Sequence, residues 1–528
     1  MKQRIFSFVC VICICTLSMV AQNISAAEQY EAFKRRVMKE YNDFRDECNK
    51  TYAEFVRKAW KEYELLPSIP TPKEEVVPPI VFPEEEEKEQ PRPVDPDKNE
   101  EEQKIPIQGE ESIEEDTIQP QEEVIPEEEA MDEELVIEVI PAVEPGPQPL
   151  PVAPIKEEPQ PTEEYFTFSY CGTECKVRLD ARHRFVLPDC SENSIADAWE
   201  QCADAIYNNA IRDCLELRIR HSLCDWAYLQ MLQALGNSFF DNGSNEATLL
   251  TAYLYCQSGY KMRLARNGVR LYLMVASRHL MFEHPYLTID GEQYYPLDYK
   301  EGEQFYVCSA SFPKEQALSL WMEQAPSLHV VRTDSRMLQS KRYPELKAEV
   351  YTNKNLLTYF DSYPSSEIGG DKMTCWAMYA QTPISEEIKE SLYPALREKL
   401  QGLSQADAAN RLLNFVQTAF EYEYDDVVWG GERALFAEES LHYPYCDCED
   451  RSILYSHLVR DLLGLDVALV YYPGHLATAV CFTDDVQGDY LTINNRRFTI
   501  CDPTYINAPI GASMPNLEYD KIEVIVLE

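Results

Sequence analysis

The sequence predicts a protein of the α+β class, in which helices and strands are mixed without strict alternation. Apolar residues recur at helical spacing in three segments, at 194–217, 246–257 and 405–420. Runs rich in β-branched and aromatic residues indicate strands at 269–275, 286–295, 349–360, 467–472, 476–482 and 522–527. With 528 residues, the chain is longer than one hydrophobic core usually organises, so we expect more than one domain.

Residues 1–27 have the pattern of a secretory signal peptide. Basic Lys2 and Arg4 precede an apolar run from Ile5 to Ala21, and small residues follow up to Ala27. The apolar run is shorter than the roughly 20 residues that a membrane-spanning helix needs, so we expect cleavage near Ala27. The protein is therefore predicted to be exported, to the periplasm, the cell surface or the extracellular space.

Cysteine content follows from this expectation. Three of the 17 cysteines lie in the predicted signal, and most of the others are expected to form disulfides in an oxidising compartment. We expect Cys446 to pair with Cys481 or Cys501, while Cys48 is a candidate for a bond across a helix interface. A zinc site made of Cys446, Cys448, Cys481 and Cys501 is an alternative, although its spacing differs from that of common zinc modules.

Residues 28–64 are predicted to form one long amphipathic helix. Three apolar units recur every 11 residues: Phe33, Val37 and Tyr41; Phe44, Cys48 and Tyr52; and Phe55, Ala59 and Tyr63. This period keeps one apolar stripe on a nearly straight helix. An isolated helix is marginal in water, so the stripe must pack on something. The stripe indicates either self-association through a right-handed coiled-coil bundle or, as the alternative, docking on the chain's own domains.

Residues 65–164 are rich in proline and glutamate and are predicted to be a disordered linker. The formal net charge of the chain is −43, and most of this acidic excess lies in the linker. Nucleic acid is therefore not an expected partner. Within the linker, alternating apolar residues that include Ile137 and Val139 indicate a candidate docking strand.

The globular part contains a weak internal duplication. The segment YLTIDG at 286–291 recurs as YLTINN at 490–495, and an acid follows each at the same interval, Asp298 and Asp502. We therefore expect a first copy at 165–300, an intervening and mostly β region at 301–385, and a second copy at 386–528.

The first copy is expected to be degenerate. Gly243 or Ser244 stands where the second copy has Cys448, and Leu271 stands where it has His475. Only the acid, Asp298, is retained. We expect this copy to be a packing platform or a substrate-binding half rather than a second catalytic site.

The second copy contains the candidate catalytic residues. Cys448 lies at the start of a predicted helix, where backbone N–H groups and the helix dipole favour a thiolate. Its acidic neighbours oppose this effect, so a cationic partner is needed, and His475 opens the following strand. Asp502 closes a later strand and could orient the imidazole ring.

The order of these motifs resembles the transglutaminase-like superfamily, which has a papain-like core. It comprises a cysteine at a helix start within Asp-Cys-Glu-Asp, a glycine ending that helix, a histidine opening a strand, and Asp-Pro-Thr after the next hairpin. The resemblance covers roughly residues 405–505 and implies that Cys448 is the nucleophile, His475 the base and Asp502 the third member. Candidates for oxyanion stabilisation beside the Cys448 N–H are Trp429, Tyr445 and Gln417.

No cofactor or metal is implied by the resemblance. The acids Asp447, Glu449 and Asp450 lack the regular ligand spacing of a calcium loop. We expect a cysteine-dependent acyl-transfer enzyme that cleaves peptide or glutamine-type amide bonds through a thioester, with water favoured as acceptor and a protein or peptide as substrate. The alternative is a non-catalytic binding or structural module of the cell envelope.

Overall fold

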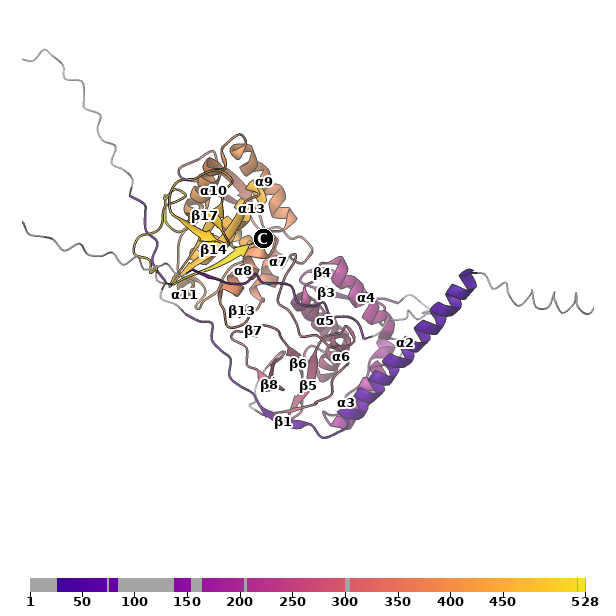
Figure 1. Cartoon of the computed structure of the whole chain (residues 1–528). Helices are drawn as coiled ribbons and strands as arrows, with labels where there is room; N and C mark the ends of the chain where they lie inside the picture. The colour runs from indigo at the N-terminus through magenta and orange to yellow at the C-terminus, as the bar shows by residue number, and fades with distance from the viewer. Residues whose placement is uncertain are drawn as a thin grey trace, which may run out of the picture.

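The computed structural model describes residues 26–73, 76–83, 137–152, 164–203, 207–299, 304–519 and 521–527. Within these residues the chain is of mixed α+β class with several sheets, as predicted. Figure 1 shows two lobes, a first lobe of residues 164–307 and a second lobe of residues 336–527. The predicted signal peptide lies almost wholly outside the described residues. Among those described, no helix is both long and apolar enough to cross a membrane.

The first lobe packs helices against a six-stranded sheet of order β1-β10-β5-β6-β9-β8. Its helical segments are η1 (Ala181–His183), α3 (Glu192–Cys202), α4 (Tyr207–Arg220), α5 (Asp225–Phe239) and α6 (Asn245–Gln257). Its strands are β1 (Lys61–Glu64), the hairpin β3 (Phe166–Tyr170) and β4 (Thr173–Val177), β5 (Met262–Asn267), β6 (Arg270–Ala276), β7 (Leu280–Met281), β8 (Leu287–Ile289), β9 (Glu292–Pro296) and β10 (Gln304–Val307). The helical spacing at 194–217 thus corresponds to two helices, α3 and α4.

The second lobe has a sheet of order β16-β17-β15-β14-β18-β2. Its helices are α9 (Glu386–Leu400), α10 (Gln405–Ala419), α11 (Asp425–Val428), α12 (Ala437–His442) and α13 (Cys448–Leu463). Its strands are β14 (Asp466–Tyr472), β15 (His475–Cys481), β16 (Tyr490–Ile493), β17 (Arg496–Cys501), β18 (Ile522–Leu527) and the added strand β2 (Ile137–Val139). Helix α13 packs on β14 and β15 and against α10.

The two sheets share one order of connection. In each, a helix leads into two antiparallel strands, then a hairpin that joins the second strand, then a last strand that joins the first. A strand from the N-terminal part of the chain extends each sheet at the same edge. Strand β1 pairs antiparallel with β10, and β2 pairs parallel with β18.

The region at 301–385 is not mostly β, contrary to our prediction. Besides β10 it has the hairpin β11 (Arg336–Gln339) and β12 (Lys347–Val350), the two-residue strand β13 (Ser366–Glu367), and the helices α7 (Lys354–Asp361) and α8 (Met373–Gln381). The strand predicted at 349–360 ends at Val350. The Asn353 side chain then accepts the Asn355 N–H at 3.1 Å and begins α7, because an asparagine at this position satisfies an orphan donor of the first turn.

The predicted helix at 28–64 is shorter than expected, since α2 spans Ala26–Val56. Beyond it the Trp60 indole N–H donates to the Val56 carbonyl at 2.9 Å, and Lys61–Glu64 pairs with β10 instead of continuing the helix. Figure 1 shows α2 lying alongside α3. The C-terminal half of α2 therefore docks on the first lobe, as in the alternative interpretation.

A buried hydrogen-bond cluster fixes this docking. The Asn49 side chain accepts the Trp199 indole N–H at 3.2 Å and the Gln257 amide N–H at 3.0 Å, and it donates to Gln257 at 3.3 Å. All three residues are at most 2% exposed. Of the predicted stripe, Phe33, Phe44 and Phe55 are 54%, 50% and 44% exposed, whereas Tyr52 is 2% exposed, so the phenylalanines face away from the lobe and Tyr52 packs on it.

The predicted disordered linker is ordered over the parts that the structure describes. Two segments cross both lobes: residues 65–73 and 76–83, called here the first strap, and residues 137–152, called the second strap. They are held because their backbone groups find partners on sheets and loops; Val152 N–H, for example, donates to the Gln257 carbonyl at 3.1 Å. The candidate docking strand is confirmed as β2. Residues 84–136 and 153–163 of the predicted linker lie outside the described residues.

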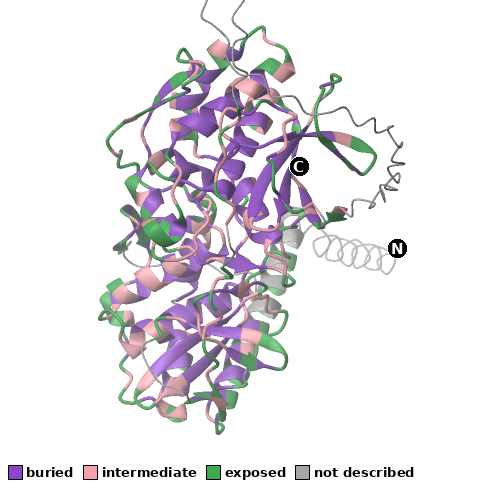
Figure 2. Cartoon of the chain, turned by 90° about the vertical axis from the view of Figure 1, so that its left-hand side faces the viewer, coloured by how far each residue is buried: buried purple, intermediate pink, exposed green. Residues whose placement is uncertain are grey.

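The hydrophobic cores of the two lobes show where the first strap packs. Figure 2 shows buried residues throughout the helices and sheets of both lobes. One cluster of buried apolar side chains runs through both lobes, while the outer face of each sheet carries a smaller cluster of its own. The first strap covers part of the outer face of the second sheet with Val77, Ile80 and Phe82.

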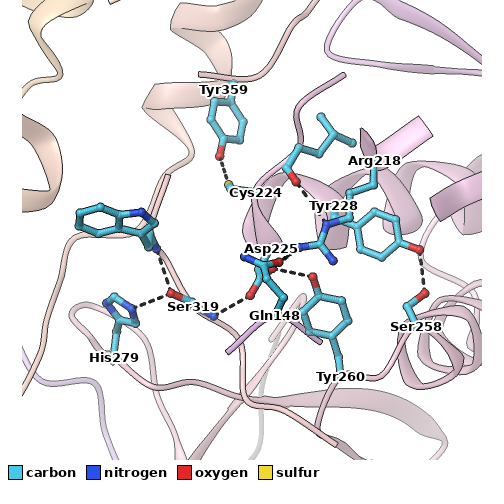
Figure 3. A network of polar contacts seen from close by, with 12 residues as sticks. Gln148, Arg218, Cys224, Asp225, Tyr228, Ser258, Tyr260, His279, Ser319 and Tyr359 are labelled. Carbon is cyan, nitrogen blue, oxygen red and sulfur yellow. Dashed lines mark hydrogen bonds and ion pairs between the residues drawn. The ribbon is translucent and has the colours of Figure 1, made fainter. Parts of the chain in front are cut away.

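The second strap ends at a polar network around Asp225, the first residue of α5 (Figure 3). The Asp225 carboxylate accepts hydrogen bonds from the Arg218 guanidinium at 2.7 Å, from the Tyr260 hydroxyl at 2.6 Å and from the Ser319 N–H at 3.0 Å. Arg218 also donates to the Gln148 side chain on the strap at 3.2 Å. The buried charge of Asp225 is thus fully paired.

No disulfide joins any of the 14 cysteines that the structure describes. The predicted pairing of Cys446 with Cys481 or Cys501 is therefore wrong, and these thiols with Cys448 do not form a metal-binding group either. Ten of the 14 are buried, where a thiol behaves as a small apolar side chain, and seven of these ten lie in helices or strands.

Candidate functional site

Cys448 is the first residue of α13, as predicted. The helix is held against β15 by the Ser452 hydroxyl, which donates to the Leu476 carbonyl at 2.9 Å. The Leu476 backbone N–H lies against the Cys448 sulfur and acts to lower the pKa of the thiol. Gly464 ends α13 in the left-handed conformation, with φ of 66°, which glycine adopts without strain. Cys448 thereby lies against Leu476, the residue that follows His475 in β15.

His475 opens β15 directly after Gly474. Its Nε2 atom lies 2.8 Å from Asp502 Oδ2, and both residues are 1% exposed. With the carboxylate as acceptor, Nε2 carries the ring proton and Nδ1 is left as the basic nitrogen. Among the described residues Nδ1 has no hydrogen-bond partner, and His475 lines the same cavity as Cys448.

The loop after β17 fixes Asp502. Its Oδ1 atom accepts the Thr504 N–H at 2.8 Å and the Tyr505 N–H at 3.1 Å. From the other side, the Gln417 side-chain amide donates to the Asp502 carbonyl at 3.0 Å and to the Tyr505 carbonyl at 2.8 Å. The three predicted residues are thus brought together, and α10 supplies Gln417 as a support for the acid.

The cavity that Cys448 and His475 share is small, about 60 Å³. It lies between α8, α13 and the start of β15, and its wall includes Trp376, Lys372 and Tyr471. Its other walls are made by Phe282, Ser365, residues 432–434 and residues of the first strap.

Burial raises the pKa of the Cys448 thiol well above its ordinary value, and the charges of Glu449 and Asp447 add to the effect. The thiol lies 3.2 Å from Glu449 Oε2, to which it donates. The helix N-terminus was expected to lower the pKa of this thiol. In this closed arrangement burial outweighs that effect, because desolvation destabilises the thiolate more than the helix dipole stabilises it. Burial thus favours the neutral thiol over the thiolate.

A buried carboxylate cluster surrounds the nucleophile. Asp425, Asp447 and Glu449 each place an oxygen within 4.8 Å of the others, close enough for one cation to contact all three. Burial is the main cause that raises the pKa of Asp425 to about 8, and it raises those of Asp447 and Asp450 well above the usual range. Sequence reasoning missed Asp425, because it lies on a separate short helix, α11, and ligands from two elements show no loop spacing.

The predicted oxyanion residues do not line the cavity. The Gln417 amide is engaged in the Asp502 loop, as described above. The Trp429 ring contacts Tyr443, with ring centroids 4.7 Å apart, and Tyr445 is 37% exposed at the surface. Trp376 of α8 is the tryptophan of this cavity, and it was missed because α8 precedes the domain boundary predicted at residue 386.

In the first lobe, α6 begins with an asparagine where α13 begins with a cysteine, and β6 begins with Arg270 where β15 begins with a histidine. Asn245, rather than Gly243 or Ser244, is the first residue of α6, and its amide accepts the Leu271 N–H at 2.9 Å and donates to the Val269 carbonyl at 2.9 Å. The Asn245 amide also donates to the sulfur of Cys190 at 3.1 Å. Asp298 is exposed and accepts a hydrogen bond from Gln233 at 3.2 Å. The Asn245 side chain thus forms hydrogen bonds with the backbone of the first lobe.

No protein-family model matches this chain, and comparison with curated proteins and with solved structures finds no similar one. What can be said of its chemistry therefore comes from the site itself.

Proposed function

We propose that the protein is a cysteine-dependent acyl-transfer enzyme of the transglutaminase-like superfamily that hydrolyses peptide or glutamine-type amide bonds. The observation that carries the proposal is the orientation of His475. Its Nε2 is bound to Asp502 at 2.8 Å, which leaves Nδ1 as a base in the cavity that it shares with Cys448. This is the order of nucleophile, base and orienting acid that nucleophilic catalysis requires.

The proposed reaction begins when His475 Nδ1 takes the Cys448 proton and the thiolate attacks the substrate carbonyl carbon. The oxyanion that forms is stabilised by the Cys448 N–H at the start of α13. The imidazolium gives its proton to the leaving amine, the carbon–nitrogen bond breaks, and a thioester remains. Water then attacks the thioester with His475 as base, which releases a carboxylic acid and restores the thiol.

The architecture supports a papain-like core and a duplication. A helix that begins at the nucleophile and packs on an antiparallel sheet is the arrangement the resemblance implies. The shared strand order of the two lobes supports descent from one repeated unit. Under this proposal the first lobe is the non-catalytic copy.

A peptide-library digest tests the activity. We expect cleavage by the wild type, and its loss in Cys448→Ala and His475→Ala, because each variant lacks a reacting group. Cys481→Ala is the matched control, since Cys481 is a half-buried thiol at the far end of β15. Cleavage that survives Cys448→Ala would contradict the assignment.

The second candidate is a non-catalytic binding or structural module. The closed state of the site favours it, because Cys448 is 4% exposed and its burial favours the neutral thiol over the thiolate. A thiol-directed electrophile separates the two candidates. Labelling of Cys448 that falls in His475→Ala supports the enzyme, whereas equal labelling in both supports the binding module.

A further inference from the structure

The first strap crosses the cavity that holds Cys448 and His475. Thr71, Pro72 and Val76 line one side of this cavity. The Val77 N–H donates to the carbonyl of Gly474 at 3.0 Å, directly before His475. A segment remote in sequence from the catalytic residues thus makes a backbone hydrogen bond at their edge.

Both ends of the strap are anchored, one on each lobe. On the first lobe, Leu66 and Tyr286 exchange two backbone hydrogen bonds, of 2.8 and 3.2 Å, and the Thr71 N–H donates to Glu283 Oε1 at 3.0 Å. On the second lobe, the Ile506 N–H donates to the Ile80 carbonyl at 2.9 Å, and the Phe82 N–H donates to the Ile506 carbonyl at 2.8 Å. Between these anchors, the described residues Thr71, Pro72 and Val76 line the cavity.

The strap leaves no room for a substrate. Sites for drug-sized ligands have volumes of roughly 300 Å³ or more, whereas the cavity beneath the strap has about 60 Å³. Cys448 and His475 are 4% and 1% exposed. Removal of the strap would open the side of this cavity that Thr71, Pro72 and Val76 line.

The contacts that the first strap makes at the cavity indicate which kind of ligand could take its place. Its backbone is bonded to Gly474, its apolar Val76 lines the cavity with Trp376, and the Lys73 ammonium lies 2.6 Å from the Asp426 carboxylate. The Lys73 pair is exposed and contributes little to stability, so its value is selectivity rather than strength.

We propose that the first strap is a built-in inhibitor that occupies the substrate groove, and that the substrate is an extended apolar peptide with a basic residue opposite Asp426. The substrate class rests on the proposed function. The peptide replaces the strap and donates a backbone N–H to the Gly474 carbonyl. Displacement also ends the burial that favours the neutral Cys448 thiol.

Alkylation of the full-length protein by iodoacetamide tests the strap, with Cys448 followed by mass spectrometry. Val77→Pro removes the donor to Gly474, and Val76→Asp places a charge in the apolar wall. We expect Cys448 to react about tenfold faster or more in either variant, because the rate follows the open fraction. Leu150→Asp on the second strap, where Leu150 is 74% exposed, should react like the wild type. Equal rates in all four proteins would overturn the proposal.

A synthetic peptide of residues 70–82 provides a second measurement that does not depend on how the variants fold. It should slow the alkylation of Cys448 in Val77→Pro, whereas a scrambled peptide should not; equal effects of the two peptides would contradict occupation of the groove. The two proposals fail separately. Faster alkylation without cleavage of any library peptide retains the inhibitor and rejects the enzyme, whereas equal cleavage by wild type and Val77→Pro retains the enzyme and rejects the inhibitor.

Discussion

At the scale of single residues, the carboxylates around Cys448 dominate the chemistry of the site. Asp425 has its pKa raised to about 8, with burial as the main cause and Glu449 as the next. Its folded pKa therefore lies above its unfolded value. Such a group weakens folding as pH rises from about 4 to about 8, because the folded state must either keep a proton that the unfolded state gives up or bury a charge.

Asp425→Asn should remove this loss of folding stability at higher pH. We expect the variant to be more stable than the wild type at pH 8 by several kcal/mol, and the difference to shrink toward pH 5, since each unit of pKa shift corresponds to about 1.4 kcal/mol. Urea unfolding at both pH values measures it. The exposed neighbour Asp426 is the control, as Asp426→Asn should leave the pH dependence unchanged. If the wild type showed this pH dependence only after EDTA treatment, a bound cation rather than a proton would neutralise Asp425 in the untreated protein, which would contradict the prediction.

The residues of the trio could be predicted from sequence because each has a local marker: a helix start, a strand start after glycine and a strand end. Asp425 and Trp376 have no such marker. Their position beside Cys448 is set by the packing of α11 and α8, which depends on contacts with elements far away in the chain. The same holds for Gln417, whose role as a support for Asp502 follows from a loop about 85 residues further along the sequence.

At the scale of elements, α2 was predicted by its period, but its end was not, and its buried face was predicted only in part. Tyr52 of the predicted stripe is buried against the first lobe, while the phenylalanines of the stripe are exposed. The rest of the docking face contains Arg45, Asn49, Ala53 and Val56. A docking face that contains polar residues cannot be recognised from the pattern of apolar residues. Such residues can be buried when they form hydrogen bonds, as Asn49 does with Trp199 and Gln257.

The exposed stripe supports the proposal that α2 self-associates. Replacement of Phe33, Phe44 and Phe55 together by serine should lower the sedimentation mass of the full-length protein to that of a monomer, because the contact loses its apolar surface. Analytical ultracentrifugation measures this. Lys39→Ser with Lys50→Ser is the matched control, since these exposed residues have the same 11-residue spacing and no apolar ring. An unchanged mass in the phenylalanine variant would remove the proposal.

At the scale of the whole molecule, the lobes are joined by the chain that composition predicted to be a spacer. Proline and like charge disfavour a core within such a segment, yet they leave its backbone and its scattered valines and isoleucines free to bind existing sheets. Composition alone cannot reveal this, because the partners, β18 and the outer face of the second sheet, are made elsewhere. The strand order common to both lobes has the same origin: pairing between distant strands is a property of the assembled fold.

The free cysteines give a prediction for the intact protein. Since the described cysteines are unpaired, all 14 thiols outside the predicted signal should react with Ellman's reagent in denaturant without reductant. The melting temperature should also be the same with and without dithiothreitol, because reduction removes about 2–5 kcal/mol only from proteins that depend on disulfides. A serine variant of surface-accessible Cys481 should lower the count by one and serves as the calibration. A count lower by an even number, together with a melting temperature that falls on reduction, would show that cysteines pair and would restore the pattern expected of an exported protein.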